Sequence, residues 1–136
     1  MAKNDAARIW RLNFQLSTDV LIEATPAFAM LDLEAKEFFV LDGIEDRPYP
    51  AALAQHLSMP KPTMTLYLKT LQKKGFIARG IDPDDLRRHR LELTPSGRRT
   101  VERARTALST RYGERLARLG RGEQAEFARL LEKLTG

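Results

Sequence analysis

The chain has 136 residues, of which 43% are hydrophobic and 30% are charged, the usual size and composition of one globular domain. It contains no cysteine, which excludes disulfides, thiolate metal sites and cysteine nucleophiles. No apolar run approaches the roughly 20 residues that a membrane-spanning helix needs, and the N-terminus lacks the apolar stretch of a signal peptide. We therefore expect a cytoplasmic protein.

The net charge of +5 is distributed unevenly along the chain. Residues 1–59 carry 5 basic and 9 acidic side chains, whereas residues 60–105 carry 12 basic and 5 acidic ones. A local cationic field of this kind attracts the phosphates of DNA or RNA, although charge alone is explained equally well by a solvated basic face. The middle third of the chain is thus the candidate for a nucleic-acid contact.

Apolar residues at helical spacing predict two helices at the start of the chain. The first covers about residues 5–24, has an unusually wide apolar face and is expected to end before Pro26. Asp32 is expected to cap a second helix over residues 33–42, which stops at Gly43.

Two further helices are predicted before the spacing of apolar residues changes from helical to strand-like at residue 76. A short helix is expected over residues 51–57, followed by a longer one whose first turn contains Pro60 and Pro62, where proline is tolerated. The longer helix should run to about Lys74 and stop at Gly75. Its core-facing positions are Met64, Leu68 and Leu71.

A β-hairpin is predicted next. Residues 76–81 and 88–93 have the composition and alternation of two strands, and the polar, proline-containing residues 82–87 between them suit a hairpin tip. The rest of the chain has helical spacing again. The fold class is therefore mostly α with a small β-hairpin wing.

Two helices are expected to complete the chain. Thr94 can cap a long helix with a sustained apolar stripe, which Gly120 and Gly122 are expected to break. A last helix is expected over residues 123–134, with its apolar residues on one side.

A short helix, a turn, a longer helix and a basic hairpin follow one another in a winged helix-turn-helix. In that fold the longer helix enters a major groove of DNA and the hairpin reaches the neighbouring minor groove. Threonine hydroxyls suit phosphates or base edges, lysines suit phosphates, and Leu66 suits a thymine methyl group. The predicted contact surface of the longer helix comprises Lys61, Pro62, Thr63, Thr65, Leu66 and Lys69.

Cationic side chains at the hairpin tip form a second candidate contact with DNA. Arg87 and Arg88 stand beside Asp85, and a long cationic side chain at such a tip can enter a narrow minor groove. Asp85 is expected to hold Arg87 by an ion pair or to cap the turn, and the alternative is an ordinary hydrated turn aspartate.

Two stretches of the sequence carry a family pattern. The first joins LAQHL at residues 53–57 with TMT at residues 63–65 and LKTLQKKGFI at residues 68–77. The second, DLR at residues 85–87 followed by LELTPSG at residues 91–97, is the more specific of the two. Together with the flanking helices they resemble the MarR (multiple antibiotic resistance regulator) family of bacterial winged-helix repressors.

This resemblance covers nearly the whole chain and implies a single domain. Residues 32–95 would form the winged helix-turn-helix DNA-binding lobe, and residues 1–31 and 96–136 the dimerisation helices. The implied function is a sequence-specific, ligand-responsive repressor that binds a pseudo-palindromic double-stranded DNA operator as a homodimer, with Arg87 in the minor groove. Dimerisation also follows from the apolar faces of the terminal helices, which the rest of the chain is too small to cover.

The tip of the predicted recognition helix departs from the family pattern. Pro60 stands where relatives usually have a capping serine, Pro62 where a second serine often contacts DNA, and Leu66 where arginine or another polar reader is common. Arg88 and His89 replace residues that are often small or apolar, and they are expected to restore part of the phosphate affinity. A second reading therefore stays open, in which the chain is a non-specific nucleic-acid-binding or protein-interaction winged-helix module.

The resemblance also implies an effector. In similar proteins a small aromatic or amphipathic ligand binds between the dimerisation helices and the winged lobe and changes the spacing of the recognition helices. Each candidate wall residue is also a plausible core residue, so the sequence does not specify the ligand. The candidates are Trp10, Phe14, Phe28, Met30, Phe38 and Tyr112.

An enzyme reading has little support in the sequence. Asp82, Asp84, Asp85 and His89 fall on the predicted hairpin, where a hydrated turn is the simpler explanation than an acid/base or metal group. A loosened dinucleotide-binding pattern at residues 120–125 joins two helices and follows no strand. We expect no catalytic residue, no metal and no cofactor.

Overall fold

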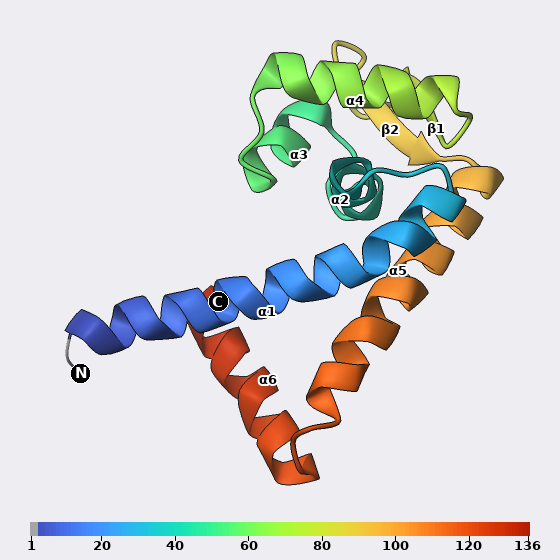
Figure 1. The fold of residues 1–136 in the computed structure, drawn as a ribbon. Coiled ribbons are helices and arrows are strands. Elements are labelled where there is room, and N and C mark those ends of the chain that lie inside the picture. The colour runs from blue at the N-terminus through green and yellow to red at the C-terminus, as the bar shows by residue number, and fades with distance from the viewer. Residues whose placement is uncertain (1–2) are drawn as a thin grey trace. The chain divides into compact units, whose positions relative to one another are not determined.

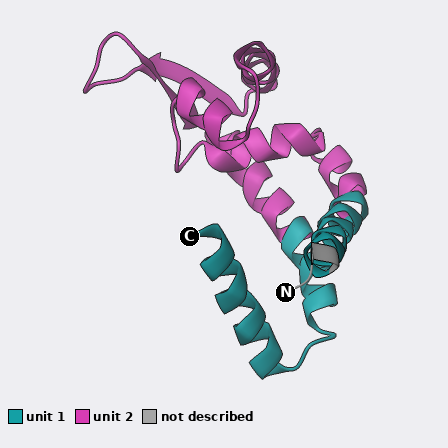
Figure 2. Cartoon of the chain, turned by 90° about the vertical axis from the view of Figure 1, so that its left-hand side faces the viewer, with its two compact units in different colours: residues 1–23, 108–136 teal, residues 24–107 magenta. Residues whose placement is uncertain are grey.

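The computed structural model describes residues 3–136, which divide into two compact units (Figure 2). Unit 1 consists of the described chain up to Glu23 together with Leu108–Gly136, and unit 2 is Ala24–Ala107. The helices α1 and α5 contribute to both units. In chain order the elements labelled in Figure 1 are α1 (Lys3–Met30), α2 (Ala35–Gly43), α3 (Pro50–His56), α4 (Lys61–Lys73), β1 (Ile77–Ile81), β2 (His89–Leu93), α5 (Pro95–Leu116) and α6 (Arg121–Thr135). The predicted fold class, mostly α with a hairpin wing, is confirmed.

The first helix is longer than the sequence predicted. Pro26 lies inside α1 and does not end it. Proline removes the N–H that would bond the carbonyl of Ile22, and because both residues are exposed, water can satisfy that carbonyl. The helix ends instead at Met30, just before a left-handed residue, Asp32, with φ 59°.

Asp32 does not cap α2, contrary to the prediction. An N-cap residue needs an extended backbone, which Glu34 has and the left-handed Asp32 lacks. The Glu37 carboxylate accepts a hydrogen bond of 2.9 Å from the backbone N–H of Glu34 in a capping box. The chain therefore turns at Asp32, and the helix begins at Ala35 with Glu34 as its N-cap.

Unit 2 is built around α4, against which α2 and α3 both pack (Figure 1). The same helix leads through Gly75, which has φ 80°, into β1. Apolar side chains from every element of the unit fill its core. The most deeply buried are Phe28, Val40, Leu41, Ile44, Leu53, Met64, Leu68, Leu71, Leu91, Val101 and Ala104.

The two strands form an antiparallel hairpin whose register pairs Ile77 with Leu93 and Ile81 with His89. Ile77 and Leu91 are its buried strand residues, and the rest of the hairpin is largely exposed. A backbone hydrogen bond of 2.7 Å from Leu91 N–H to the carbonyl of Pro48 fastens β2 to the segment before α3.

Close backbone packing joins the start of α5 to the start of the hairpin. Thr94 caps α5 as predicted, its hydroxyl oxygen accepting a hydrogen bond of 3.0 Å from Gly97 N–H. A Cβ on Gly97 would lie 1.9 Å from the backbone oxygen of Phe76, so this close approach requires glycine.

Unit 1 has a helix boundary that also differs from the prediction. Gly122 does not separate the last two helices, because it lies in the first turn of α6, whose N-cap is Gly120. Arg115 on α5 forms ion pairs with Glu23 and Asp19 on α1. None of the described helices is both long enough and apolar enough to cross a membrane.

Candidate nucleic-acid interface

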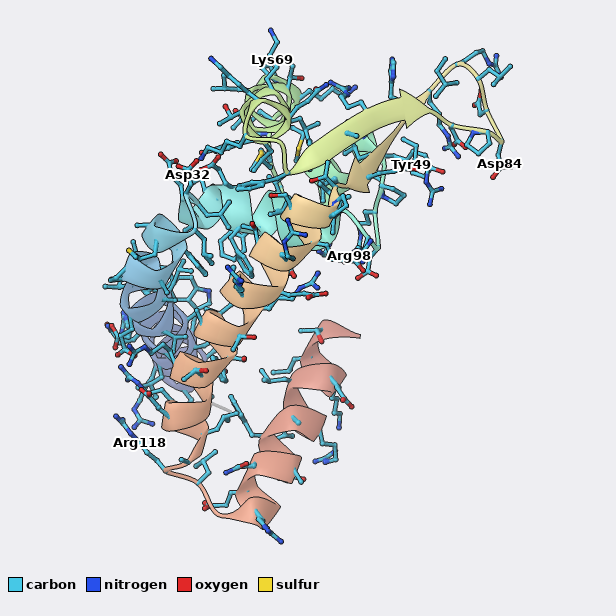
Figure 3. The ribbon with its side chains drawn as sticks, turned by 90° about the vertical axis from the view of Figure 1, so that its right-hand side faces the viewer. Asp32, Tyr49, Lys69, Asp84, Arg98 and Arg118 are labelled. Atoms are coloured by element: carbon cyan, nitrogen blue, oxygen red, sulfur yellow. The ribbon has the colours of Figure 1, made fainter. Side chains whose placement is uncertain are left out.

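The outward face of α4 is determined by what its other face buries. Met64, Leu68 and Leu71 are at most 1% exposed, so any rotation of the helix about its axis would expose apolar surface. Figure 3 shows Lys69 projecting from α4 away from the neighbouring elements of unit 2. Five of the predicted contact residues are exposed and Thr63 is half-buried; the exposed five are Lys61, Pro62, Thr65, Leu66 and Lys69.

Apolar groups occupy the middle of this face. The Thr65 hydroxyl donates a hydrogen bond of 3.0 Å to the carbonyl of Lys61 within the helix, so its proton is already used. Leu66 is 65% exposed, and Pro62 has no N–H to offer. Pro60 occupies the N-cap position without a side-chain cap. The middle of this face is therefore mainly apolar and offers no free side-chain hydroxyl proton for hydrogen bonding.

The C-terminal end of α4 is anchored by Lys74. Its Nζ donates to the carbonyl of Asp32 at 2.7 Å and to the two carboxylate oxygens of Glu37 at 2.9 and 3.0 Å. Burial alone lowers the pKa of Lys74, but the hydrogen bonds and charges of Glu37 and Asp32 outweigh it, and the pKa is raised above its ordinary value. Lys74 thus stays charged and holds α4 to the start of α2.

Arg87 is the most accessible cation at the wing tip, with 93% of its side chain exposed. Its backbone N–H donates to Asp85 Oδ1 at 3.0 Å, and its Nε lies 3.4 Å from the same oxygen. Asp85 thus caps the turn and also lies beside the guanidinium. An exposed ion pair of this kind contributes little energy, so the guanidinium is free to exchange the carboxylate for another anion.

Arg88 lies in a different environment from its neighbour. Its Nε donates a hydrogen bond of 2.7 Å to Asp82 Oδ2, and its guanidinium carbon lies 3.9 Å from the centre of the Tyr49 ring. The sequence grouped Arg88 with Arg87 as a DNA contact, whereas the structure engages it within the protein. His89 is exposed at the start of β2.

Asp82 is fully buried beneath the hairpin tip, with no exposed surface. The backbone N–H of Asp84 bonds its Oδ1 at 2.9 Å. Although burial alone raises the pKa of Asp82, this N–H together with Arg88 and Tyr49 holds the pKa below its ordinary value. Asp82 and Asp85, two of the aspartates that were considered as a possible acid/base group, thus stabilise the conformation of the hairpin instead.

Several cations of the basic middle third are neutralised internally, which leaves others free. Arg98 lies 3.6 Å from Glu45, and Arg105 pairs with Asp42. Within the part of the chain that the structure describes, Lys61 and Lys69 have no carboxylate at ion-pair distance. The outward face of α4 therefore carries two lysines, Lys61 and Lys69, that the described residues do not neutralise.

The six residues predicted as effector walls are divided between the units. Trp10 and Phe14 stack with ring centres 5.1 Å apart and are more than half exposed. Phe28 and Phe38 stack at 4.8 Å inside the core of unit 2, so they line no open space. Unit 1 carries Trp10, Phe14 and Tyr112, and unit 2 carries Phe28, Met30 and Phe38.

Sequence reasoning did not find Tyr49 or the role of Asp82. Tyr49 contacts Arg88 and Arg90, which are far from it along the chain, whereas Asp82 bonds Asp84 and Arg88 within the hairpin but belongs to no recognisable local pattern. One feature of the sequence pointed to this contact: Arg88 stands where relatives often have a small or apolar residue, and a cation at that position needs a partner.

A model of the MarR family matches residues 33–89. The HTH-type transcriptional repressor Rv2887 of Mycobacterium tuberculosis is 31% identical over 98% of both chains, and the repressor Mb2911 of Mycobacterium bovis matches equally. The solved complex of Rv2887 with DNA has a TM-score of 0.75 at 30% identity, covering 93% of this chain and 96% of that one.

A second solved structure, wild-type MarR from E. coli in its apo form, has a TM-score of 0.77 at 26% identity and covers 93% of this chain and 96% of that one. The family match includes α4 and the wing tip, the two parts on which the exposed residues predicted to contact DNA lie. The shared fold and the identity over nearly the full length agree with the winged helix-turn-helix order of the elements. The chain belongs to the MarR family.

Proposed function

We propose that this protein is a DNA-binding transcriptional repressor that reads double-stranded DNA with α4 and the wing. The observation that carries the proposal is the pairing of an outward face on α4, cationic and apolar, with an exposed Arg87 at the hairpin tip. These are the two elements that a winged helix-turn-helix directs into adjacent grooves. The relative Rv2887, solved with DNA, supports the assignment.

Arg87→Ala is expected to weaken binding to an A·T-rich duplex and to lower the slope of log affinity against log salt by about one, because one phosphate-neutralising cation is lost. Fluorescence anisotropy at several salt concentrations measures both quantities. Arg118→Ala removes the same charge from an exposed position on unit 1 and is the matched control. Equal losses for the two variants would contradict the role of Arg87.

Base recognition by α4 would rely on thymine methyl groups more than on hydrogen bonds. The exposed Leu66, the ring of Pro62 and the methyl of Thr65 are apolar, and the Thr65 hydroxyl proton is held by the helix. In the major groove the C5-methyl of thymine is the apolar group that distinguishes a base pair containing thymine. We therefore infer a half-site that contains thymine where Leu66 meets the groove.

Replacing thymine by deoxyuridine in a bound duplex is expected to weaken binding by roughly fourfold per contacted methyl, since burial of one such group contributes about 0.8 kcal/mol. Leu66→Ala should remove most of this discrimination. Leu86→Ala, which truncates an exposed leucine on the wing, should keep it. Discrimination that survives Leu66→Ala unchanged would rule out this contact.

The protein is proposed to act as a homodimer. In unit 1 large apolar side chains are exposed, among them Trp10, Leu12, Phe14 and Leu134 at 62%, 56%, 55% and 81%. So many large apolar side chains exposed on one unit are rare on a monomer. Sedimentation equilibrium at micromolar concentration should give twice the mass of the 15.5 kDa chain; a single-chain mass would exclude the dimer.

A small aromatic acid is the proposed effector. The relative Rv2887 has been solved with salicylic acid and with p-aminosalicylic acid. Salicylate is expected to lower DNA affinity by roughly 5- to 150-fold at saturation, the usual range of coupling between two sites. Benzyl alcohol, which has no carboxylate, is the control. Calorimetric binding of salicylate with no change in DNA affinity would show that the ligand is not an effector.

A further inference from the structure

An ion pair between a buried carboxylate and a half-exposed arginine holds the hairpin tip. Asp82 has no exposed surface, yet its carboxylate is fully engaged: Oδ1 accepts from Asp84 N–H at 2.9 Å and Oδ2 from Arg88 Nε at 2.7 Å. The backbones of Asp82 and Arg88 are joined as well, since Asp82 N–H donates to the carbonyl of Arg88 at 3.0 Å. A buried carboxylate needs such partners, so Arg88 is not free to leave it without cost.

Tyr49 provides the platform on which this pair rests. The guanidinium of Arg88 stacks over the ring at 3.9 Å, and Arg90 donates to the Tyr49 hydroxyl at 3.4 Å. Figure 3 shows Tyr49 beside the strands of the hairpin, while Asp84 lies in the loop at its tip. Tyr49 is also the N-cap of α3, the first helix of the helix-turn-helix. The contact thus links the hairpin directly to the pair of helices that carries the outward face.

These contacts separate the two neighbouring arginines by role. Arg88 is half exposed and bound on two sides, whereas 93% of the Arg87 side chain is exposed. We propose that Arg88 is a positioning residue, which by joining the buried Asp82 to the ring of Tyr49 fixes the wing on the start of α3 and so sets where Arg87 meets DNA. The proposal rests on the DNA-binding function proposed above.

The physical benefit is preorganisation. A two-stranded hairpin in water is marginally stable by itself, and its tip would have to be ordered when DNA binds. A tip that is already held by an ion pair, a stacked guanidinium and backbone bonds loses less conformational entropy on binding. The clamp formed by Tyr49, Asp82 and Arg88 therefore affects affinity without any of its three side chains contacting DNA.

The variant Asp82→Asn tests the clamp, because the competing explanations predict opposite changes in DNA affinity. Asp82→Asn makes the protein more positive by one charge, so simple electrostatics, or Arg88 acting as a released phosphate contact, would tighten binding. The clamp predicts roughly three- to tenfold weaker binding to a labelled A·T-rich duplex, the size of a typical coupling between contacting residues. Tighter or unchanged binding by Asp82→Asn would overturn the proposal.

Tyr49→Leu removes the aromatic platform without changing any charge, and it is expected to weaken binding to a similar extent. Tyr49→Phe keeps the ring beneath the guanidinium and loses only the hydroxyl, which bonds Arg90 and the Asp82 carboxylate, so it is the matched control and is expected to weaken binding less than Tyr49→Leu. A loss of affinity of the same size in Tyr49→Phe and Tyr49→Leu would show that the stacked ring is not the platform.

A double-mutant cycle with Arg87→Ala distinguishes positioning from general damage. If the clamp acts through Arg87, then Tyr49→Leu costs affinity in the wild type but has little further effect once Arg87 is alanine. Losses that add in full would overturn the proposal. Thermal unfolding identifies variants that fail to fold. If Asp82→Asn does not fold, the test rests on the Tyr49 variants and their cycle with Arg87→Ala. If the wild type does not bind duplex at all, the proposed function fails, which is a separate result.

Discussion

The burial of one face of α4 is the constraint on which the candidate interface depends. Because Met64, Leu68 and Leu71 fill the centre of unit 2, the helix has one orientation, and the residues half a turn away must face outwards. The end of the helix is held as well, by the ion pair between Lys74 and Glu37. The outward face is consequently a rigid surface, and its composition decides what kind of contact it makes with DNA.

Charge is arranged so that attraction and orientation come from different residues. Lys74, Arg88, Arg98 and Arg105 are paired with carboxylates inside unit 2, where they hold elements together. The lysines of the outward face of α4 lack such partners among the described residues, and Arg87 has only an exposed, weak one. The exposed cations on α4 and at the wing tip thus stand on a framework that ion pairs within unit 2 hold together.

Local patterns in the sequence predicted the elements well and the long-range contacts poorly. The stop at Gly75, the cap at Thr94 and the buried stripe of α4 all follow from short-range rules, and the structure has them. The predictions at Pro26 and Asp32 were wrong because solvent exposure lets α1 continue past the proline, and the left-handed backbone of Asp32 delays the start of α2. The stacking of Arg88 on Tyr49 joins residues that are far apart along the chain, and rules based on local spacing do not predict such contacts.

The central claim is that a dimer presents two copies of this interface to one duplex, and selection of bound duplexes from a random DNA library at near-physiological salt tests it most directly. We expect a two-fold-related motif with half-sites about ten base pairs apart, the spacing that places two recognition helices on one face of DNA. Enrichment of bound DNA without any motif would contradict the account. It would mean that the apolar tip of α4 has lost sequence readout and that the chain binds duplexes through charge alone.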